Sequence, residues 1–197
     1  MHRPAALARF ISAFDAGTRG MLGDGHPASA ITQRVCSALQ RPSGDAGDGS
    51  CQTLPACRHL DAALAHTRAG AASLAELADA LHALAPLLLW CRSTRAGTPE
   101  FSEGHANTQI VGPDGMERRS DVVLGASLLA PNVAYPFHGH PPEEIYLVMS
   151  EGEWFTREAG WYSPGIGGIV HHPPDVMHAM RSGATPLLAV WCLWTGT

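Results

Sequence analysis

The run Tyr135-Pro-Phe-His138-Gly-His140-Pro-Pro-Glu143-Glu144-Ile-Tyr146 gathers six side chains that can bind a metal or move a proton into twelve residues. A seventh follows in Pro173-Pro-Asp-Val-Met-His178. Two prolines between the histidines and the acidic pair cannot donate backbone hydrogen bonds, so they interrupt regular strand pairing. The run is therefore expected to hold two short extended segments that meet at a turn.

Strand geometry assigns faces to these side chains. Residues i and i+2 of a strand point to the same side, so His138 and His140 share one direction. After the prolines, Glu144, Tyr146 and Val148 are expected on one face, and Ile145, Leu147 and Met149 on the other. An inward carboxylate beside imidazoles is costly to bury unless a cation neutralises it.

The ligand types narrow the choice of metal. Imidazole nitrogen and carboxylate oxygen form a mixed set that accepts Zn, Fe(II), Mn, Co or Ni, and the sequence alone does not select among these ions. No cysteine lies in the cluster, which disfavours a closed structural zinc site. The alternative is a solvated loop with ordinary polar residues, in which Tyr146 only packs.

The chain changes character near residue 100. Before it, Ala and Leu recur at three- and four-residue steps around Leu60–Leu64 and Leu74–Leu84, as in amphipathic helices. Ser73 and Glu76 are expected to form a capping box, and residues 40–55 a loop. After residue 107 short strands and Gly/Pro turns predict a β-barrel. The expected strands are Gln109–Val111, Asp121–Leu129, Glu144–Met149, Gly152–Thr156, Gly168–His171 and Pro186–Trp194.

Composition excludes several classes of protein. The chain has 197 residues and a formal net charge of −5, and its 13 Lys and Arg are dispersed, which disfavours nucleic-acid binding. Its most apolar run, residues 84–90, is too short to span a bilayer, and the N-terminus lacks a clean signal-peptide pattern. Five cysteines at irregular spacing do not form a disulfide framework. We therefore expect a cytoplasmic protein, with neither a nucleic-acid nor a membrane partner.

The spacing of the metal-binding residues resembles the two cupin motifs. His138-x-His140, three residues and Glu144 match the first motif, and Pro173 with His178 match the second. The chain departs from the pattern at three glycine positions: Asn132 and Asp175 replace two glycines, and Gly152 comes one residue late. It also has Ser182 in an Asn position. These departures are expected to reshape both hairpins slightly.

A narrower resemblance is to the cupin-type dimethylsulfoniopropionate (DMSP) lyases of marine bacteria. It rests on the Tyr-Pro-Phe-His-x-His-Pro-x-Glu-Glu-x-Tyr run, on Pro-Pro-x-x-x-His-Ala and on a Trp-rich last strand. The resemblance implies a helical N-terminal region (1–107) that packs on a single cupin β-barrel (108–197), also called a double-stranded β-helix.

The same resemblance implies roles for particular residues. The metal ligands would be His140, Glu144, His178 and Tyr146. Tyr135 would be the base, and His138 would line the site beside the metal or substrate. Which of Tyr135 and Tyr146 removes the proton stays open.

The chemistry of DMSP cleavage fits these residue types. A proton leaves the carbon next to the carboxylate, and dimethyl sulfide departs to leave acrylate. A divalent metal stabilises the developing negative charge and favours a nearby phenolate, whose ordinary pKa is near 10. Aromatic rings attract the sulfonium, and we expect Trp191 and Trp194 to supply them.

Two alternatives remain at this stage. The chain could be another cupin metalloenzyme, such as a dioxygenase or an isomerase, because fold alone does not determine chemistry. It could also be a non-catalytic cupin that binds a small ligand. A monomer and a homodimer are both compatible with the sequence. The paired tyrosines favour the DMSP lyase.

Overall fold

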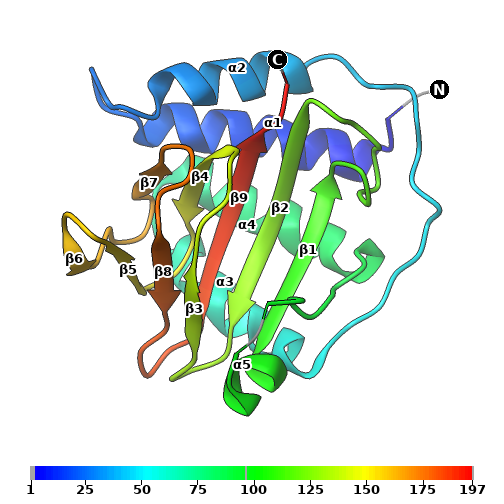
Figure 1. Cartoon of the computed structure of the whole chain (residues 1–197). Coiled ribbons are helices and arrows are strands. Elements are labelled where there is room, and N and C mark those ends of the chain that lie inside the picture. The colour runs from blue at the N-terminus through cyan, green and yellow to red at the C-terminus, as the bar shows by residue number, and fades with distance from the viewer. Residues whose placement is uncertain (1–2, 96, 197) are drawn as a thin grey trace.

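The computed structural model describes residues 3–95 and 97–196 and places a helical layer against two β-sheets (Figure 1). The first sheet has five strands in the order β1-β2-β9-β4-β7, and the second has four in the order β3-β8-β5-β6. Helices α1 to α4 lie behind the five-stranded sheet, and the small sheet lies on its other side. The helices are α1 (Ala5–Met21), α2 (Ser29–Leu39), α3 (Leu60–Arg68), α4 (Ala72–Leu84) and α5 (Pro99–Gly104). The strands are β1 (His105–Val111), β2 (Val122–Leu129), β3 (Ala134–His138), β4 (Glu143–Val148), β5 (Glu153–Thr156), β6 (Gly160–Tyr162), β7 (Ile169–His172), β8 (His178–Arg181) and β9 (Leu187–Trp194).

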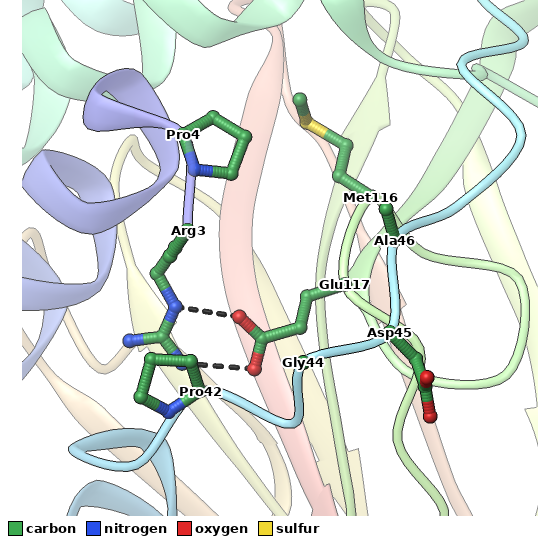
Figure 2. Close-up of a pocket in the computed structure, with 8 residues that line it drawn as sticks. All are labelled: Arg3, Pro4, Pro42, Gly44, Asp45, Ala46, Met116 and Glu117. Carbon is green, nitrogen blue, oxygen red and sulfur yellow. Dashed lines mark hydrogen bonds and ion pairs between the residues drawn. The ribbon is translucent and has the colours of Figure 1, made fainter. Parts of the chain in front are cut away.

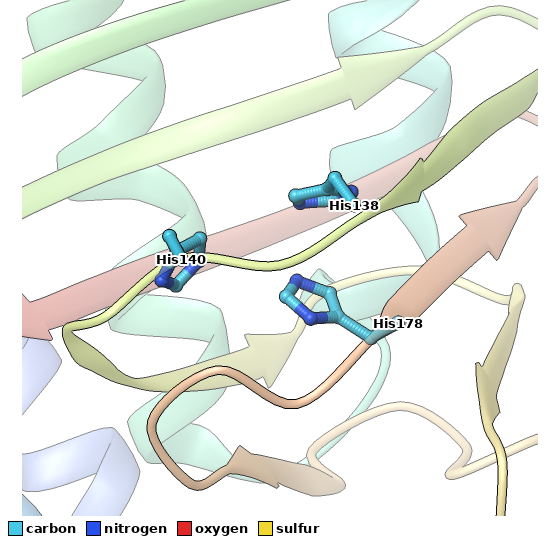
Figure 3. Close-up of side chains that lie close together, drawn as sticks. All are labelled: His138, His140 and His178. Atoms are coloured by element: carbon cyan, nitrogen blue, oxygen red, sulfur yellow. The ribbon is translucent and has the colours of Figure 1, made fainter.

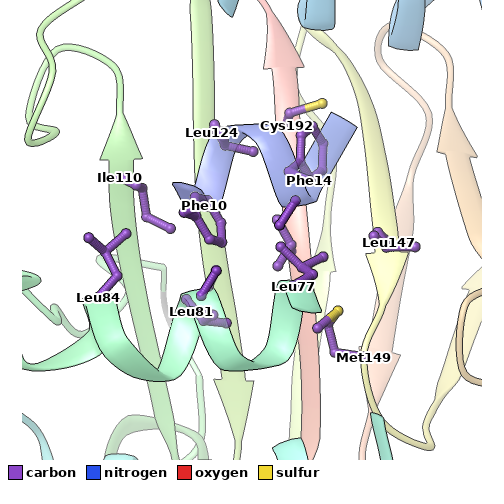
Figure 4. Packing of buried hydrophobic residues seen from close by; sticks show 14 of the residues in the cluster. Phe10, Phe14, Leu77, Leu81, Leu84, Ile110, Leu124, Leu147, Met149 and Cys192 are labelled. Atoms are coloured by element: carbon purple, nitrogen blue, oxygen red, sulfur yellow. The ribbon is translucent and has the colours of Figure 1, made fainter. Parts of the chain in front are cut away.

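The apolar core between helices and sheet forms because α1 and α4 each present one hydrophobic face. Phe10 and Phe14 of α1 and Leu77 and Leu81 of α4 are fully buried against the sheet (Figure 4). From the sheet, Ile110, Leu124, Leu147 and Cys192 point toward them. Burial of each such side chain contributes roughly 1.5–3 kcal/mol, so this layer is a main source of stability.

The two faces of β4 confirm the alternation expected from the sequence. Ile145, Leu147 and Met149 pack in the helix-facing core, whereas Tyr146 and Val148 belong to a second buried cluster between the two sheets. All of β2 is buried, because the helices cover one face and the small sheet the other. The helix-facing side chains of these strands form the core, so the side chains on the other face can form a polar site between the two sheets.

A buried ion-pair cluster ties the start of the chain to the β1–β2 hairpin. Both ends of the Glu117 carboxylate accept hydrogen bonds from Arg3, at 2.5 and 2.8 Å (Figure 2). Arg119 approaches the same carboxylate at 3.4 Å and pairs with Asp121 at 2.8 Å. The backbone amide of Ser43 also donates to Glu117, so the loop after α2 is held by the same group.

Several local expectations from the sequence need correction. Ser73 does not cap α4, because the helix begins at Ala72 and Glu76 instead pairs with Arg9 at 2.8 Å. The strand expected at residues 109–111 begins at His105. The sequence also did not predict two strands, β6 and β8, or three helices, α1, α2 and α5, and it predicted β3 only as an extended segment.

In the described part of the chain, no helix is both long enough and apolar enough to cross a membrane.

Candidate metal centre and pocket

Three histidines meet where β3 ends and β8 begins. His138 is the last residue of β3, His140 follows two residues later, and His178 opens β8 (Figure 3). β3 and β8 are paired with His138 opposite His178, so the sheet register itself brings the two motifs together. One ring nitrogen from each histidine lies within 4.8 Å of the others, close enough for a single metal ion to bridge them.

Backbone carbonyls fix which nitrogen of each ring is free. Nδ1 of His138, His140 and His178 lies 2.8–2.9 Å from the carbonyl oxygens of Pro136, Pro142 and Val176. A carbonyl oxygen only accepts, so each Nδ1 carries the proton and donates it. In the neutral rings the Nε2 lone pairs are therefore free. This is how metal-binding histidines are commonly oriented by their second nitrogen.

Glu144 places a buried carboxylate beside these lone pairs. Its Oε2 lies 3.0 Å from Nε2 of His140 and 3.3 Å from Nε2 of His178. The side chain of Glu144 is 5 % exposed, and Nε2 of His178 makes no well-aligned hydrogen bond among the described residues. Carboxylate oxygen facing imidazole lone pairs is unfavourable unless a cation lies between them. The donor set thus fits a divalent transition metal.

The pKa values of Glu144, His140 and His138 are shifted because these groups are buried close together. Burial alone would raise the pKa of Glu144, but the hydrogen bond with His140 and the proximity of both His140 and His178 lower it to about 2. The pKa of His140 is raised, chiefly by its hydrogen bond to Glu144. Burial lowers the pKa of His138 to about 4, and the neighbouring charge of His178 adds to the effect. In the metal-free protein a proton shared with His140 thus offsets part of the Glu144 charge.

Two tyrosines flank the cluster in different environments. Tyr146 is 4 % exposed, and burial followed by the charge of Glu144 raises its pKa well above 10. Tyr135 is half-buried; its ring lies 4.7 Å from that of His138, and its hydroxyl lies 3.4 Å from Oγ of Ser93. Tyr146 is therefore a protonated, enclosed phenol in the metal-free protein, whereas Tyr135 reaches the rim.

A cavity of about 120 Å³ opens beside the cluster, and we name it the inner pocket. It is lined by Arg95, Asn107, Ser127, Tyr135, His138, His140, Glu144, Tyr146, Met180, Trp191 and Leu193. Arg95, Asn107 and Tyr135 also line an adjoining, larger cavity, the outer pocket, together with residues 91–94. The inner pocket thus lies beside the histidine cluster, both tyrosines and the ring of Trp191, and the outer pocket connects it with solvent.

One site residue expected from the sequence lies elsewhere. Trp194 packs on the helix-facing side of β9, where Arg34 sits 5.5 Å from its ring, and it does not line the inner pocket. The reason is strand alternation, because Trp191 and Trp194 are three residues apart and so face opposite sides. Trp191 lines the pocket as expected. Glu143 points away from the cluster and lies 2.8 Å from His171.

Two buried histidines belong to this region although the sequence reading left them out. The ring of His172 stacks on His178, with centroids 4.0 Å apart, and burial lowers its pKa to about 3. His105 lies 3.0 Å from Oγ of Ser127, and its ring contacts Tyr135. Alternation of His105, Asn107 and Gln109 with the buried Ala106 and Ile110 was the available signal for an earlier start of β1.

Two positions that hold glycine in the cupin motifs carry other residues here, but their backbone keeps the left-handed conformation that glycine adopts easily. Asn132 and Asp175 have φ values of 59° and 62°, the left-handed region that Asn and Asp tolerate best among residues with a side chain. The backbone amide of Asp175 donates to the carbonyl of His140 at 2.9 Å. This bond ties the first motif to the second, so the substitution preserves the turn that positions His178.

Comparisons with known proteins agree with this geometry. Residues 28–189 match the family model described as dimethylsulfoniopropionate lyase. The chain is 30 % identical over 128 residues to the dimethylsulfoniopropionate lyase DddQ of Ruegeria pomeroyi, and the match spans 62 % of each chain. The chain therefore matches somewhat less than two thirds of the length of that curated relative.

Solved structures share the fold over most of the chain. A structure from a study of the DMSP lyases RdDddP and RnDddQII superposes with a TM-score of 0.71 at 24 % identity, covering 96 % of this chain and 92 % of that one. The structure of DddQ from Ruegeria pomeroyi DSS-3 gives 0.68 at 20 % identity, covering 91 % and 92 %. The resemblance expected from the motifs is confirmed, and the chain belongs to the dimethylsulfoniopropionate lyase family.

Proposed function

We propose that this protein cleaves DMSP to dimethyl sulfide and acrylate at the inner pocket, and that its two sheets form the single barrel of the cupin fold. The observation that carries the proposal is a cluster of His138, His140 and His178 whose ring nitrogens lie within 4.8 Å of one another. The buried Glu144 carboxylate lies 3.0 Å from Nε2 of His140 and 3.3 Å from Nε2 of His178, and two phenols line the same pocket. Membership of the family supports the same reaction.

The metal ligands we propose are His140, Glu144 and His178, with His138 and Tyr146 as neighbours that can complete the shell. His138 returns as a candidate because its ring nitrogen lies in the same cluster as the other two. A bound divalent ion would act as a Lewis acid toward the substrate carboxylate, which makes the adjacent C–H bond more acidic. Zn, Fe(II), Mn, Co and Ni all remain compatible with this donor set.

Tyr135 is the proposed base. In the phenolate form it takes a proton from the carbon next to the carboxylate; the C–H electron pair forms the new C=C bond, and the C–S pair leaves with dimethyl sulfide. Tyr135 lines both the inner and the outer pocket, and Ser93 lies 3.4 Å from its hydroxyl. The proton gained therefore has a short route to solvent, which the enclosed Tyr146 lacks.

Trp191 is the proposed platform for the sulfonium. It is 7 % exposed and lines the pocket beside Met180 and Tyr146. Its indole N–H is already engaged by Asn107 at 2.9 Å, so the ring offers the pocket a π surface rather than a donor. Ring faces attract cations, and a sulfonium lacks hydrogen-bond donors that would compete for polar partners.

The experiment is headspace detection of dimethyl sulfide from purified protein given DMSP, with acrylate measured in parallel. The protein is first stripped with a chelator and then loaded with Zn, Fe(II), Mn, Co or Ni. Equimolar release of both products with at least one metal, and loss of release in the stripped protein, is the expected result. Absence of both products with all five metals would refute the lyase proposal.

A further inference from the structure

We propose that Arg95 and the side-chain amide of Asn107 form an anion-binding subsite that receives the carboxylate of a short zwitterionic substrate. The inference rests on the proposed function and deepens it, because it states how the pocket distinguishes the two ends of the substrate. Both residues line the inner pocket and both also line the outer pocket, so they stand at the passage between the two.

The orientation of the Asn107 amide follows from Trp191. The indole Nε1–H only donates, and it lies 2.9 Å from Oδ1 of Asn107, so that oxygen faces Trp191. The amide Nδ2 group, with two donors, is then turned away from the indole. Since Asn107 lines the inner pocket, it offers donors to whatever occupies the cavity.

Gly125 makes this arrangement possible. Trp191 lies opposite Gly125 in the β2–β9 register, and Asn107 lies on the next strand, β1. A Cβ atom at Gly125 would lie 2.4 Å from the indole ring of Trp191. The indole therefore crosses β2 over the bare backbone of Gly125 to reach Asn107. The donor orientation is built by three neighbouring strands and does not depend on a flexible loop.

Arg95 supplies the positive charge. It lies before α5, at the rim, and no carboxylate of the described residues pairs with it. Arg92, three residues earlier, is in contrast paired with Glu103 at 3.0 Å. The charge of Arg95 acts inside the pocket. Burial chiefly lowers the pKa of His138, and Arg95 adds a small lowering; Glu144 chiefly raises the pKa of His140, and Arg95 opposes that rise slightly.

The charges around the inner pocket favour a carboxylate beside Arg95, because Asp114 lines the outer pocket but not the inner one. The acidic group of the inner pocket, Glu144, is engaged by His140 and His178 and does not pair with Arg95. A cationic sulfonium is repelled by Arg95 and attracted by the ring of Trp191. A carboxylate has two oxygens, so one oxygen can face the position proposed for the metal and the other can accept hydrogen bonds from Arg95 and Asn107. Charge-assisted hydrogen bonds of this kind are among the stronger ones in proteins.

The test compares Arg95→Gln with Arg19→Gln, which removes the same charge from an exposed residue of α1 that is already paired with Asp15 and lines neither pocket. Binding of propionate and of neutral propionamide to the zinc-loaded protein is measured by ligand-observed NMR, and KM and kcat for DMSP by dimethyl sulfide release. Arg95→Gln is expected to weaken propionate binding and raise KM about tenfold, with little change in kcat or in propionamide binding. Arg19→Gln is expected to behave like wild type.

A second variant tests Asn107 without disturbing the indole. Asn107→Asp keeps an acceptor for Trp191 but replaces the amide donors with a negative oxygen, so propionate binding should fall at least tenfold while the near-UV circular dichroism of the tryptophans is retained. Unchanged propionate binding in both variants would overturn the subsite. Arg95-dependent propionate binding without any dimethyl sulfide release would instead refute the lyase proposal and leave the subsite standing.

Discussion

Two carboxylates in this molecule are equally buried but differently compensated. Glu117 and Glu144 are each 4 % exposed. Glu117 is held by the guanidinium groups of Arg3 and Arg119 and by a backbone amide, all permanent donors. Glu144 faces imidazole nitrogens whose other ring nitrogen already carries the proton. The first cluster is complete as it stands, whereas the second calls for a cation.

This difference distinguishes a structural ion pair from the proposed metal site. Arginine remains charged at any physiological pH, so the pairing of Glu117 depends only on the fold. Histidine gives up its proton near neutral pH and can then bind a metal. The pocket beside Glu144 is lined by histidines and tyrosines, whereas the hollow beside Glu117 is lined, around the ion pair, by Pro4, Pro42, Gly44, Asp45, Ala46 and Met116 (Figure 2). The predictions below test this contrast.

The largest effect is expected from removal of the Tyr135 hydroxyl. Tyr135→Phe should lower the rate of dimethyl sulfide release by about 10²- to 10⁴-fold, the range typical of a lost general base. Metal content, measured by mass spectrometry of the dialysed protein, should stay at the wild-type level. A variant that retains near wild-type activity would transfer the role of base to Tyr146.

The next effect concerns stability rather than activity. Glu117→Gln leaves Arg3 and Arg119 without their shared carboxylate, and loss of one partner of a buried ion pair costs about 3–5 kcal/mol. Urea unfolding should show this loss, while activity per folded molecule at low temperature stays unchanged. Glu153→Gln is the matched control, because its pair with Arg181 is exposed and should contribute less than about 1 kcal/mol. Equal stability of both variants would remove the structural role of Glu117.

A smaller effect follows from the buried His105. Burial lowers its pKa to about 3, below the value near 6.5 in an unfolded chain. As the pH falls, His105 is therefore protonated first in the unfolded state, which favours unfolding. The free energy of unfolding does not depend on this residue above pH 6.5 and decreases as the pH falls toward 3. At pH 5 the loss is about 2 kcal/mol.

The pH effect can be isolated by substitution. His105→Gln should reduce the drop in unfolding free energy between pH 7.5 and pH 5, compared with wild type, when both are measured in chelator-treated protein. An unaltered pH dependence would show that His105 is not kept neutral by burial. The absolute stability of the variant does not enter this comparison, because only the difference between the two pH values is used.

Much of the site was predictable because strand periodicity acts over short distances. The faces of Glu144 and Tyr146 and the inward direction of Trp191 follow from local alternation. Trp194 lies on the opposite face of β9 from Trp191, because three residues separate the two and an odd step reverses the face. His105, Asn107 and His172 were not predicted as site residues, because their roles depend on which strands are neighbours in the sheet. Helix α1 carried a periodic signal, since Leu7, Phe10, Ile11 and Phe14 recur at three- and four-residue steps and are buried. Arg9 interrupts the apolar run in the sequence but lies on the outer face of the helix, where it pairs with Glu76.

The central claim is that Glu144 and the histidines form a metal centre. Zinc titration of chelator-treated protein by isothermal calorimetry tests it most directly, with Glu144→Gln compared with Glu153→Gln. We expect one zinc per chain for wild type and for Glu153→Gln, and an affinity at least about a hundredfold lower for Glu144→Gln, since even supporting residues of metal sites contribute 10- to 100-fold. Equal zinc affinity in Glu144→Gln and wild type would contradict it.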